Sequence, residues 1–211
     1  MMPARALLTG LLAITLAAVG VGCSASEGAP QSGEDVSQSG EGSTGTQAAR
    51  PTITDSKLQP PPQDKKSAVD SGRPPIVFDP CTWVSNSALQ RAGFDPSSRR
   101  RLDDIVAEYS FLTCIVTSKD RKLRMNSGNA TWEENLAKVG SYSQPTNING
   151  RSALQFRDPD GLGSCEIDIQ TKVGFVQLAV DLTRFASPEA DTCDDIQNIA
   201  ATIEPEIGKD N

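Results

Sequence analysis

The first 77 residues of the chain contain no Phe, Trp or Tyr, and all ten aromatic residues of the 211-residue sequence lie from Phe78 onward. Aromatic side chains bury large apolar areas, so a stretch without them has little with which to offset the entropy of ordering. Four of the five cysteines also follow Phe78. We therefore expect one folded domain over residues 76–211, which is enough chain for a single core.

Residues 1–22 have the pattern of an export signal. Arg5 and the amino terminus are positive, and the uncharged run from residue 6 to residue 21 is shorter than the ~20 residues that cross a bilayer. The run ends at Gly22-Cys23, which resembles the lipobox of bacterial lipoproteins. That resemblance implies cleavage before Cys23 and a diacylglyceryl (palmitate-type) anchor on its sulfur. The alternative is an ordinary signal peptide that is cleaved elsewhere, with Cys23 incidental.

Residues 23–75 are dominated by small and polar side chains. Gly, Ser, Pro and Gln supply 27 of the 52 residues from 24 to 75. Such a composition cannot bury enough apolar surface to order the chain. We expect a lipidated cysteine followed by a disordered tether that holds the domain away from a membrane.

Helix and strand patterns alternate through residues 76–211. Thr131 and Glu134 have capping-box spacing, and Asp191 or Thr192 is expected to begin a last helix that ends by Pro205. Residues 95–104 are expected to form a polar loop. A first helix is expected over 85–91, and strands over 111–119, from 121, and over 148–157, 164–171 and 176–182. The order α-β-β-α-β-β-β-α predicts an α+β fold, an antiparallel sheet with helices packed on one face.

Four cysteines fall within the expected domain: Cys81, Cys114, Cys165 and Cys193. An even set in an exported domain predicts two disulfides, with three possible pairings. Two of the cysteines lie within expected strands and two lie at expected helix starts. We favour Cys81–Cys193 together with Cys114–Cys165. No Cys-x-x-Cys spacing, typical of redox or metal sites, occurs.

Several local motifs within the domain accompany the lipobox and the polar tether. They are Asp79-Pro80-Cys81, Cys114, Asn149-Gly150-Arg151 with Ala153, Cys165-x-Ile167-x-Ile169 and Cys193. The pattern, which covers about Phe78 to Ile207, is similar to actinobacterial secreted lipoproteins built on domain of unknown function 3558. The resemblance implies an envelope location and a fold, and it carries over no catalytic residue.

Several pairs of acidic residues could suggest acid–base chemistry. They are Asp103-Asp104, Glu133-Glu134, Asp158 with Asp160, Asp194-Asp195, and Glu166 with Asp168. The arginines at 99–101, which we expect to form a surface patch, can pair with Asp103-Asp104. Helix dipoles explain Glu133-Glu134 and Asp194-Asp195, and turn geometry explains Asp158 with Asp160. Glu166 and Asp168 alternate with core positions and are expected to point outward from a sheet, where no pocket forms. We therefore assign no catalytic residue.

The absence of histidine excludes Ser-His-Asp and Cys-His catalysis and histidine-ligated metal sites. No Gly-x-Ser-x-Gly, Ser-x-x-Lys or glycine-rich phosphate loop occurs. The formal charge of −7 argues against a nucleic-acid partner. We expect no cofactor, no metal ion and no nucleic acid.

The expected function is that of a non-enzymatic binding or scaffold module, anchored through Cys23 to the extracytoplasmic face of a cell membrane. Its partner is expected to be another envelope protein or a cell-wall component. Two alternatives are a histidine-free envelope hydrolase that uses paired carboxylates, and an extracellular ligand sensor. The hydrolase requires an acidic residue with a raised pKa inside a cleft.

Overall fold

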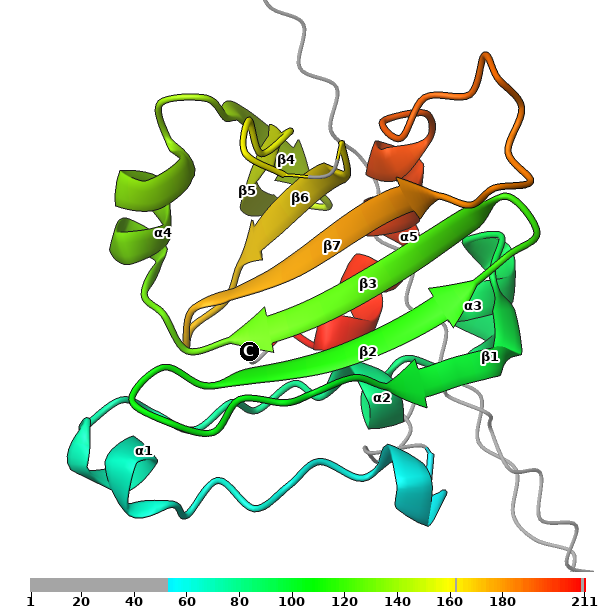
Figure 1. The fold of residues 1–211 in the computed structure, drawn as a ribbon. Helices are drawn as coiled ribbons and strands as arrows, with labels where there is room; N and C mark the ends of the chain where they lie inside the picture. The colour runs from blue at the N-terminus through cyan, green and yellow to red at the C-terminus, as the bar shows by residue number, and fades with distance from the viewer. Residues whose placement is uncertain (1–52, 162, 210) are drawn as a thin grey trace, which may run out of the picture. The chain divides into compact units, whose positions relative to one another are not determined.

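A computed structural model of the chain describes residues 53–161, 163–209 and 211, and its centre is a seven-stranded antiparallel sheet (Figure 1). The sheet has the order β1-β2-β3-β7-β6-β5-β4, so two meanders meet along the β3–β7 pair. The strands are β1 (Asp95–Arg101), β2 (Phe111–Thr117), β3 (Arg121–Gly128), β4 (Gln144–Ile148), β5 (Arg151–Phe156), β6 (Cys165–Gln170) and β7 (Phe175–Leu182). The predicted antiparallel sheet and the two disulfides are confirmed, although the order of elements differs from the predicted one.

The helices lie on both faces of the sheet. They are η1 (Ser56–Leu58), α1 (Lys66–Asp70), α2 (Pro80–Trp83), α3 (Asn86–Arg91), α4 (Trp132–Val139) and α5 (Ile196–Ile207). Buried residues of α2, α3 and α5 pack with inward side chains of the strands in the main cluster, and we call this side the core face (Figure 1). Helix α4 packs on the opposite side, the second face, in a small cluster of Val139, Leu154 and Phe156. The prediction that the helices share one face is therefore wrong for α4. None of these helices, within the described residues, has the length and apolar character that crossing a bilayer requires.

Two strands missing from the predicted order, β1 and β4, are the two edges of the sheet. The expected loop at 95–104 is largely strand β1, whose pairing with β2 is broken by an irregularity between Asp95 and Arg100. Each edge strand contains a proline, Pro96 or Pro145. Proline lacks a ladder donor and is tolerated mainly at edges, so polar edge strands with proline resemble loops in sequence.

The strand expected over residues 148–157 corresponds to β5, and the Asn149-Gly150 turn joins it to β4 in a hairpin. Both turn residues have positive φ, 51° and 95°, which matches the two-residue turn that favours Asn-Gly. The Asn149 side chain also donates to the Ala201 carbonyl of α5 at 2.8 Å. That carbonyl is the one that Pro205 cannot use, because proline has no N–H to give to the residue four positions earlier. Helix α5 therefore continues through Pro205 to Ile207 instead of ending there.

The expected cap of the last helix is also displaced. Helix α5 begins after Asp195, whose φ of 66° is left-handed and whose side chain makes no cap, whereas Asp191 and Thr192 lie in the preceding turn. The predicted capping box at Thr131 and Glu134 is confirmed in α4, with both reciprocal hydrogen bonds present.

The disulfides join Cys81 to Cys114 and Cys165 to Cys193, so the favoured pairing is wrong. Helix α2 lies against β1, β2 and β3, which brings the first pair of Cα atoms to 5.1 Å. Helix α5 lies against β4 and β6, which brings the second pair to 5.0 Å. Cys114 on β2 and Cys165 on β6 are separated by β3 and β7, so these two cysteines are too far apart to be joined. Each link closes a loop of about 30 residues, worth roughly 3 to 4 kcal/mol in the chain-entropy model.

Residues 53–75, here called the strap, run along the domain, although the sequence predicts a disordered tether up to residue 75. The Ile53 N–H donates to the Thr82 carbonyl at 3.0 Å. The Gln63 side chain exchanges two hydrogen bonds with the backbone of Ile76, at 2.9 and 2.8 Å. The strap has few apolar side chains to bury, so these hydrogen bonds with the backbone hold it in place. The predicted signal 1–22, Cys23 and the tether up to residue 52 lie outside the described residues.

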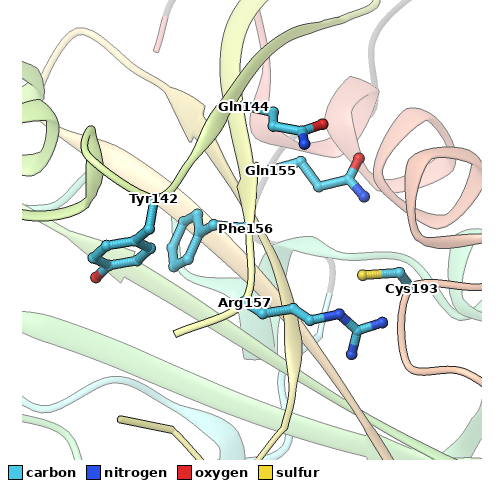
Figure 2. A pocket seen from close by; sticks show the side chains of 6 residues that line it. All are labelled: Tyr142, Gln144, Gln155, Phe156, Arg157 and Cys193. Atoms are coloured by element: carbon cyan, nitrogen blue, oxygen red, sulfur yellow. The ribbon is translucent and has the colours of Figure 1, made fainter. Parts of the chain in front are cut away.

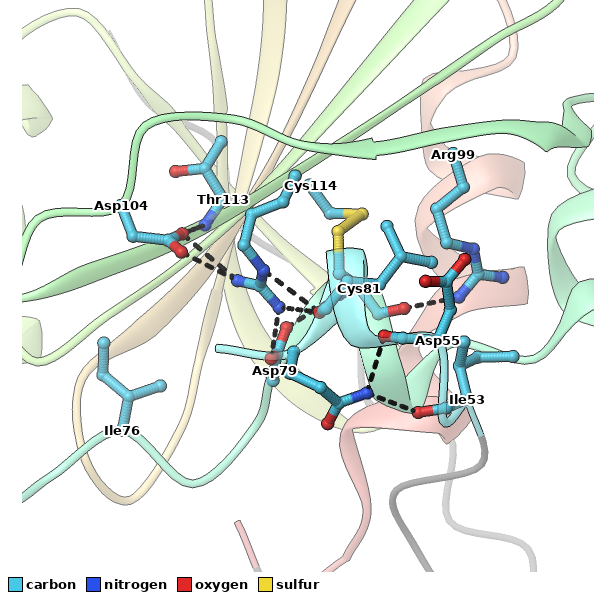
Figure 3. Close-up of polar contacts among 12 residues, drawn as sticks. Ile53, Asp55, Ile76, Asp79, Cys81, Arg99, Asp104, Thr113 and Cys114 are labelled. Carbon is cyan, nitrogen blue, oxygen red and sulfur yellow. Dashed lines mark hydrogen bonds and ion pairs between the residues drawn. A yellow bond between two sulfur atoms is a disulfide. The ribbon is translucent and has the colours of Figure 1, made fainter. Parts of the chain in front are cut away.

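The sequence predicts a surface patch at the arginines 99–101, but Arg99 and Arg101 reach into the domain. Figure 3 shows Arg99 beside Cys81. Arg101 pairs with the buried Asp79 at 2.5 Å and with Asp104 at 3.0 Å, and it also donates to the Leu58 carbonyl of the strap. Burial raises the pKa of Asp79, which Arg101 opposes. Arg99 donates to the carbonyl of Cys81 at 2.7 Å. Through these contacts, the arginines of β1 bind the strap and the residues next to the Cys81–Cys114 disulfide.

Candidate functional site around helix α4

Glu166 and Asp168 lie on the second face of β6, as the alternation predicts, but they do not face solvent. Glu166 is 8% exposed and Asp168 is 0% exposed. The prediction that they point outward is wrong because α4 lies over this part of the sheet. The sequence shows which residues share a strand face, but it does not show which element covers that face.

The Asp168 carboxylate is held by α4 from above. The Asn135 side-chain amide donates to Asp168 Oδ2 at 2.7 Å. Two buried side-chain oxygens in the described part of the chain have no hydrogen-bond partner, Asp168 Oδ1 and Ser143 Oγ, and Ser143 follows the end of α4. Burial raises the pKa of Asp168 to about 7, although the amides of Asn135 and Gln177 lower it. Burial therefore favours the protonated form of this carboxyl far more than solvent exposure would.

Glu166 forms the second half of the carboxyl pair. Burial raises its pKa, and the charges of Asp158 and Asp181 add to that effect. Arg124 on β3 lies 3.8 Å from the Glu166 carboxylate and opposes the rise. The charge of Glu166 in turn raises the pKa of Asp168. Two like-charged groups in one poorly hydrated site favour keeping one of them protonated.

The N-terminal end of α4 is fastened to the strap. Arg73 makes a two-pronged contact with Glu134, at 2.8 and 2.6 Å, and its guanidinium lies 4.0 Å from the centre of the Tyr109 ring. The Tyr109 hydroxyl donates to the same carboxylate at 3.0 Å. The Arg73 guanidinium and the Thr131 N–H lower the pKa of Glu134 to about 2. The capping-box signal located Glu134, but nothing in the sequence pairs it with Arg73.

A hollow lies at each end of α4. The first, the Arg73 hollow, measures about 300 Å³ and lies between the strap and the ends of β2 and β3, lined by Gln63, Ala68, Val69, Gly72, Arg73, Pro75, Ser110 and Asn129. The second, the Tyr142 hollow, measures about 290 Å³ and lies beside the ends of β4 and β5 (Figure 2). It is lined by Tyr142, Gln144, Gln155, Phe156, Arg157 and Cys193. Neither hollow includes Glu166 or Asp168.

The other acidic pairs have structural roles. Asp104 is a buried partner of Arg101, and Asp158 accepts the N–H of Asp160 at 3.0 Å within a turn. Asp194 accepts the N–H of Asp191 at 3.0 Å ahead of α5. Within the residues that the structure describes, no group of three or more Cys, Asp or Glu side chains is placed to hold a metal ion. The polar groups around α4 are carboxyl, amide, phenol and guanidinium groups, which form hydrogen bonds with one another.

Comparison with known proteins identifies one family. A family model described as "Protein of unknown function (DUF3558)" matches residues 18–206, which is most of the chain. No curated protein and no solved structure matches the chain significantly.

Proposed function

We propose a function for this chain as a member of the DUF3558 family, to which it belongs. The chain is an extracytoplasmic lipoprotein, attached to the outer face of a cell membrane through a diacylglyceryl group on Cys23. Its folded domain is a non-enzymatic module that binds an envelope protein or a cell-wall component at the hollows beside the two ends of α4.

The pair of disulfides carries the proposal of an extracytoplasmic location. Disulfides persist in oxidising compartments and are rare in the cytosol, and here all four domain cysteines are paired. The fifth, Cys23, follows an uncharged run and a glycine. The family match begins at residue 18, so the pattern around Cys23 belongs to the matched region. A thiol left at that position outside the cytosol is reactive, and acylation removes it.

Binding is favoured over catalysis by the environment of the carboxyl pair. Asp168 has no exposed surface, so a substrate cannot touch it while α4 is in place. The two hollows that border α4 are lined by amide, aromatic and apolar groups and by arginines already paired with carboxylates. Such hollows bind a ligand through hydrogen bonds and apolar contact.

One observation favours the hydrolase as a second candidate. The pKa of Asp168 is raised to about 7 beside Glu166, and a protonated acid next to a second carboxyl is the arrangement that acid–base catalysis uses. This function requires α4 to move away so that both carboxyls reach a substrate. Trapping α4 in place by a cross-link to β5 should abolish hydrolysis, and a binding module that uses the hollows should retain its ligand.

Metabolic labelling tests the proposed anchor. Cells that express the full chain are fed an alkyne fatty acid, and the protein is isolated and reacted with a fluorescent azide. We expect label on the natural chain and on the matched control Ser24→Ala, and none on Cys23→Ala. Equal labelling of Cys23→Ala, or no label on the natural chain, contradicts the proposal.

A further inference from the structure

We propose that the Cys165–Cys193 disulfide is a site of covalent modification by a small thiol that carries no net negative charge. The thiol enters the Tyr142 hollow on the core-face side and attacks the sulfur of Cys193. The proposal goes beyond the binding function, because it concerns the chemistry of one disulfide and not the ligand of the domain. Three features carry it: the access to Cys193, the surroundings of Cys165 and the charge beside the hollow.

The two disulfides differ in how far solvent reaches them. Cys81 and Cys114 are both 0% exposed in the main core cluster, and so is Cys165. Cys193 is partly exposed and lines the Tyr142 hollow of about 290 Å³, which has room for a thiol of a few heavy atoms. The rate of thiol–disulfide exchange depends on access to one of the two sulfurs. A thiol can therefore reach Cys193 in the folded protein, whereas the first disulfide is enclosed until the domain opens.

The part of the hollow beside Cys193 belongs to the core face. Gln155 and Arg157 alternate with Phe156 along and just after β5, so Phe156 and Tyr142 border the hollow from the second face. In Figure 2, the Gln155 and Arg157 side chains extend towards Cys193, and the Phe156 ring points the other way, towards Tyr142. A thiol on the core-face side therefore meets amide and guanidinium groups next to the disulfide.

The sulfur that leaves, that of Cys165, has a hydrogen-bond donor beside it. Gln155 Nε2 lies 3.9 Å from Cys165 Sγ. The Gln155 side-chain carbonyl accepts from the Gln197 amide of α5 at 2.8 Å, so the NH₂ group of Gln155 is the end that faces the sulfur. A disulfide sulfur is a weak acceptor, but a thiolate accepts a stronger, charge-assisted hydrogen bond. Gln155 therefore stabilises the charge that develops on Cys165 as the disulfide opens.

The thiol is the only co-reactant that the exchange requires. Its thiolate forms a bond to Cys193 Sγ as the bond between Cys193 and Cys165 breaks. The electron pair of the broken bond leaves with Cys165 Sγ, which then takes up a proton. The incoming sulfur is oxidised to a mixed disulfide on Cys193, and the Cys165 sulfur is reduced to a thiol.

The last helix can stay in place when this disulfide opens. Five apolar residues of α5 are buried in the main cluster, namely Ile196, Ile199, Ala200, Ile203 and Ile207. The turn before the helix also keeps its polar contacts, because Arg157 pairs with Asp191 and Thr192 Oγ1 donates to the Gly163 carbonyl at 2.8 Å. The mixed disulfide therefore forms on a domain that is still folded.

The charges around Cys193 select against an anionic thiol. The turn that contains it, residues 191–195, carries three aspartates. Arg157 pairs with the first of them, and Arg121 donates to the backbone carbonyl of the second at 2.8 Å. Three carboxylates against these two guanidinium groups leave the turn negative, and Coulomb repulsion slows the approach of an anion.

Mass spectrometry after brief exposure to thiols tests the proposal on the full chain from residue 23, with Cys23→Ser and both disulfides formed. Cysteamine, 2-mercaptoethanol and thioglycolate, which are cationic, neutral and anionic, are added separately at ~mM concentrations without denaturant. The reaction is stopped with N-ethylmaleimide, and the protein is digested without reduction. We expect the added thiol on Cys193, maleimide on Cys165 and an intact link between Cys81 and Cys114.

The rates of exchange test the class of thiol. Each rate is divided by the rate at which the same thiol reacts with the disulfide of 2-mercaptoethanol, which removes differences in intrinsic reactivity. We expect cysteamine to be fastest and thioglycolate slowest, with roughly a threefold range at low salt that narrows as salt is added. An equal or reversed order would overturn the proposed class.

Variants test the role of the Gln155 amide. Gln155→Leu should slow the exchange about fivefold, the effect of one hydrogen bond, whereas a glutamine that only filled space would speed the exchange when shortened. The matched control Gln144→Leu changes a second glutamine of the hollow, one with no hydrogen bond to the sulfurs of the described residues, and should react as the parent does.

Four outcomes contradict the proposal. They are no adduct on the folded protein, attachment of the thiol to Cys165 alone, equal opening of both disulfides, and an unchanged or faster exchange in Gln155→Leu. The exchange depends neither on the acyl label nor on a bound ligand. Its failure therefore leaves the proposed anchor and the binding function intact, and loss of the label leaves the thiol site intact.

Discussion

The two faces of the sheet are built from alternate residues of the same strands, yet they differ in whether the side chains they bury are apolar or charged. On the core face, Cys165, Ile167 and Ile169 of β6 are each 0% exposed in one continuous apolar cluster. On the second face, Glu166 and Asp168 lie between them along the strand, beneath one short helix, with an unpartnered carboxylate oxygen. The core face provides stability, and the second face concentrates groups that are costly to bury, as functional sites often do.

The largest expected effect compares one side chain from each face. Ile167→Ala should lower the free energy of unfolding by ~4 kcal/mol, and Leu154→Ala by ~2 kcal/mol, because the small cluster can relax around the deletion. Urea denaturation of the oxidised protein measures both. Equal losses would show that the second face is packed as firmly as the core face.

The pH dependence of stability tests the buried carboxyl. The pKa of Asp168 is raised from 3.8 to about 7 in the folded protein, so stability is fully present below pH 3.8 and is lost as the pH rises to about 7. Relative to Asp168→Asn, the natural chain should therefore lose roughly 2 to 4 kcal/mol between about pH 4 and about pH 8.

Urea titrations across this pH range give the difference between the two chains, in which the contributions of other groups cancel. The exposed Asp103→Asn is the matched control and should run parallel to the natural chain. A difference between the natural chain and Asp168→Asn that stays constant with pH would mean that Asp168 is not buried as a charge.

A smaller effect is expected where the β4–β5 turn supports α5 on the core face. Asn149→Ala loses the hydrogen bond to the Ala201 carbonyl and places an alanine at a φ of 51°. We expect a loss of ~2 kcal/mol, against ~1 kcal/mol for Asn149→Gly, which keeps the backbone conformation and loses only the side-chain hydrogen bonds to Ala201 and Glu204. Thermal unfolding of the two variants separates the contribution of side-chain hydrogen bonding from that of the left-handed backbone conformation. Identical behaviour of both variants would remove the left-handed turn from the explanation.

The smallest effect concerns the contact between the strap and α4. The pKa of Glu134 is lowered from 4.5 to about 2, so the stabilisation from its charge is present above pH 4.5 and is lost as the pH falls towards 2. Glu134→Gln should speed hydrogen exchange in α4 and the strap while leaving the core strands unchanged. Glu133→Gln, which lacks the contact with Arg73, is the control. Faster exchange throughout the domain would contradict a local role.

The sequence predicted the features that depend on local patterns. The capping box of α4, the inward positions of β3 and β7, and the alternation along β6 are each set by residues a few positions apart. The edge strands were missed because Pro96 and Pro145 resemble loop residues, and the strap was missed because its contacts are polar and join residues far apart in the sequence. No spacing rule shows that Arg101 reaches Leu58 or that Cys81 lies under β2.

The candidate site could not be predicted for the same reason, because it is formed by contacts between distant parts of the chain. The acidic residues at 166 and 168 were visible as a pair on one strand face, but their burial required knowing where α4 packs. The six residues of the Tyr142 hollow come from four separate segments, the turn after α4, β4, the end of β5 with the residue that follows it, and the turn before α5. Only the tertiary structure brings them together, and no motif in the sequence marks them.

Mass spectrometry of the natural protein, extracted from cell membranes and digested without reduction, tests the central claim most directly. The account predicts a first residue Cys23 that carries a diacylglyceryl mass, together with peptides linked through Cys81–Cys114 and Cys165–Cys193. A protein recovered from the cytosol with an unmodified Cys23 and four reduced domain cysteines would contradict it.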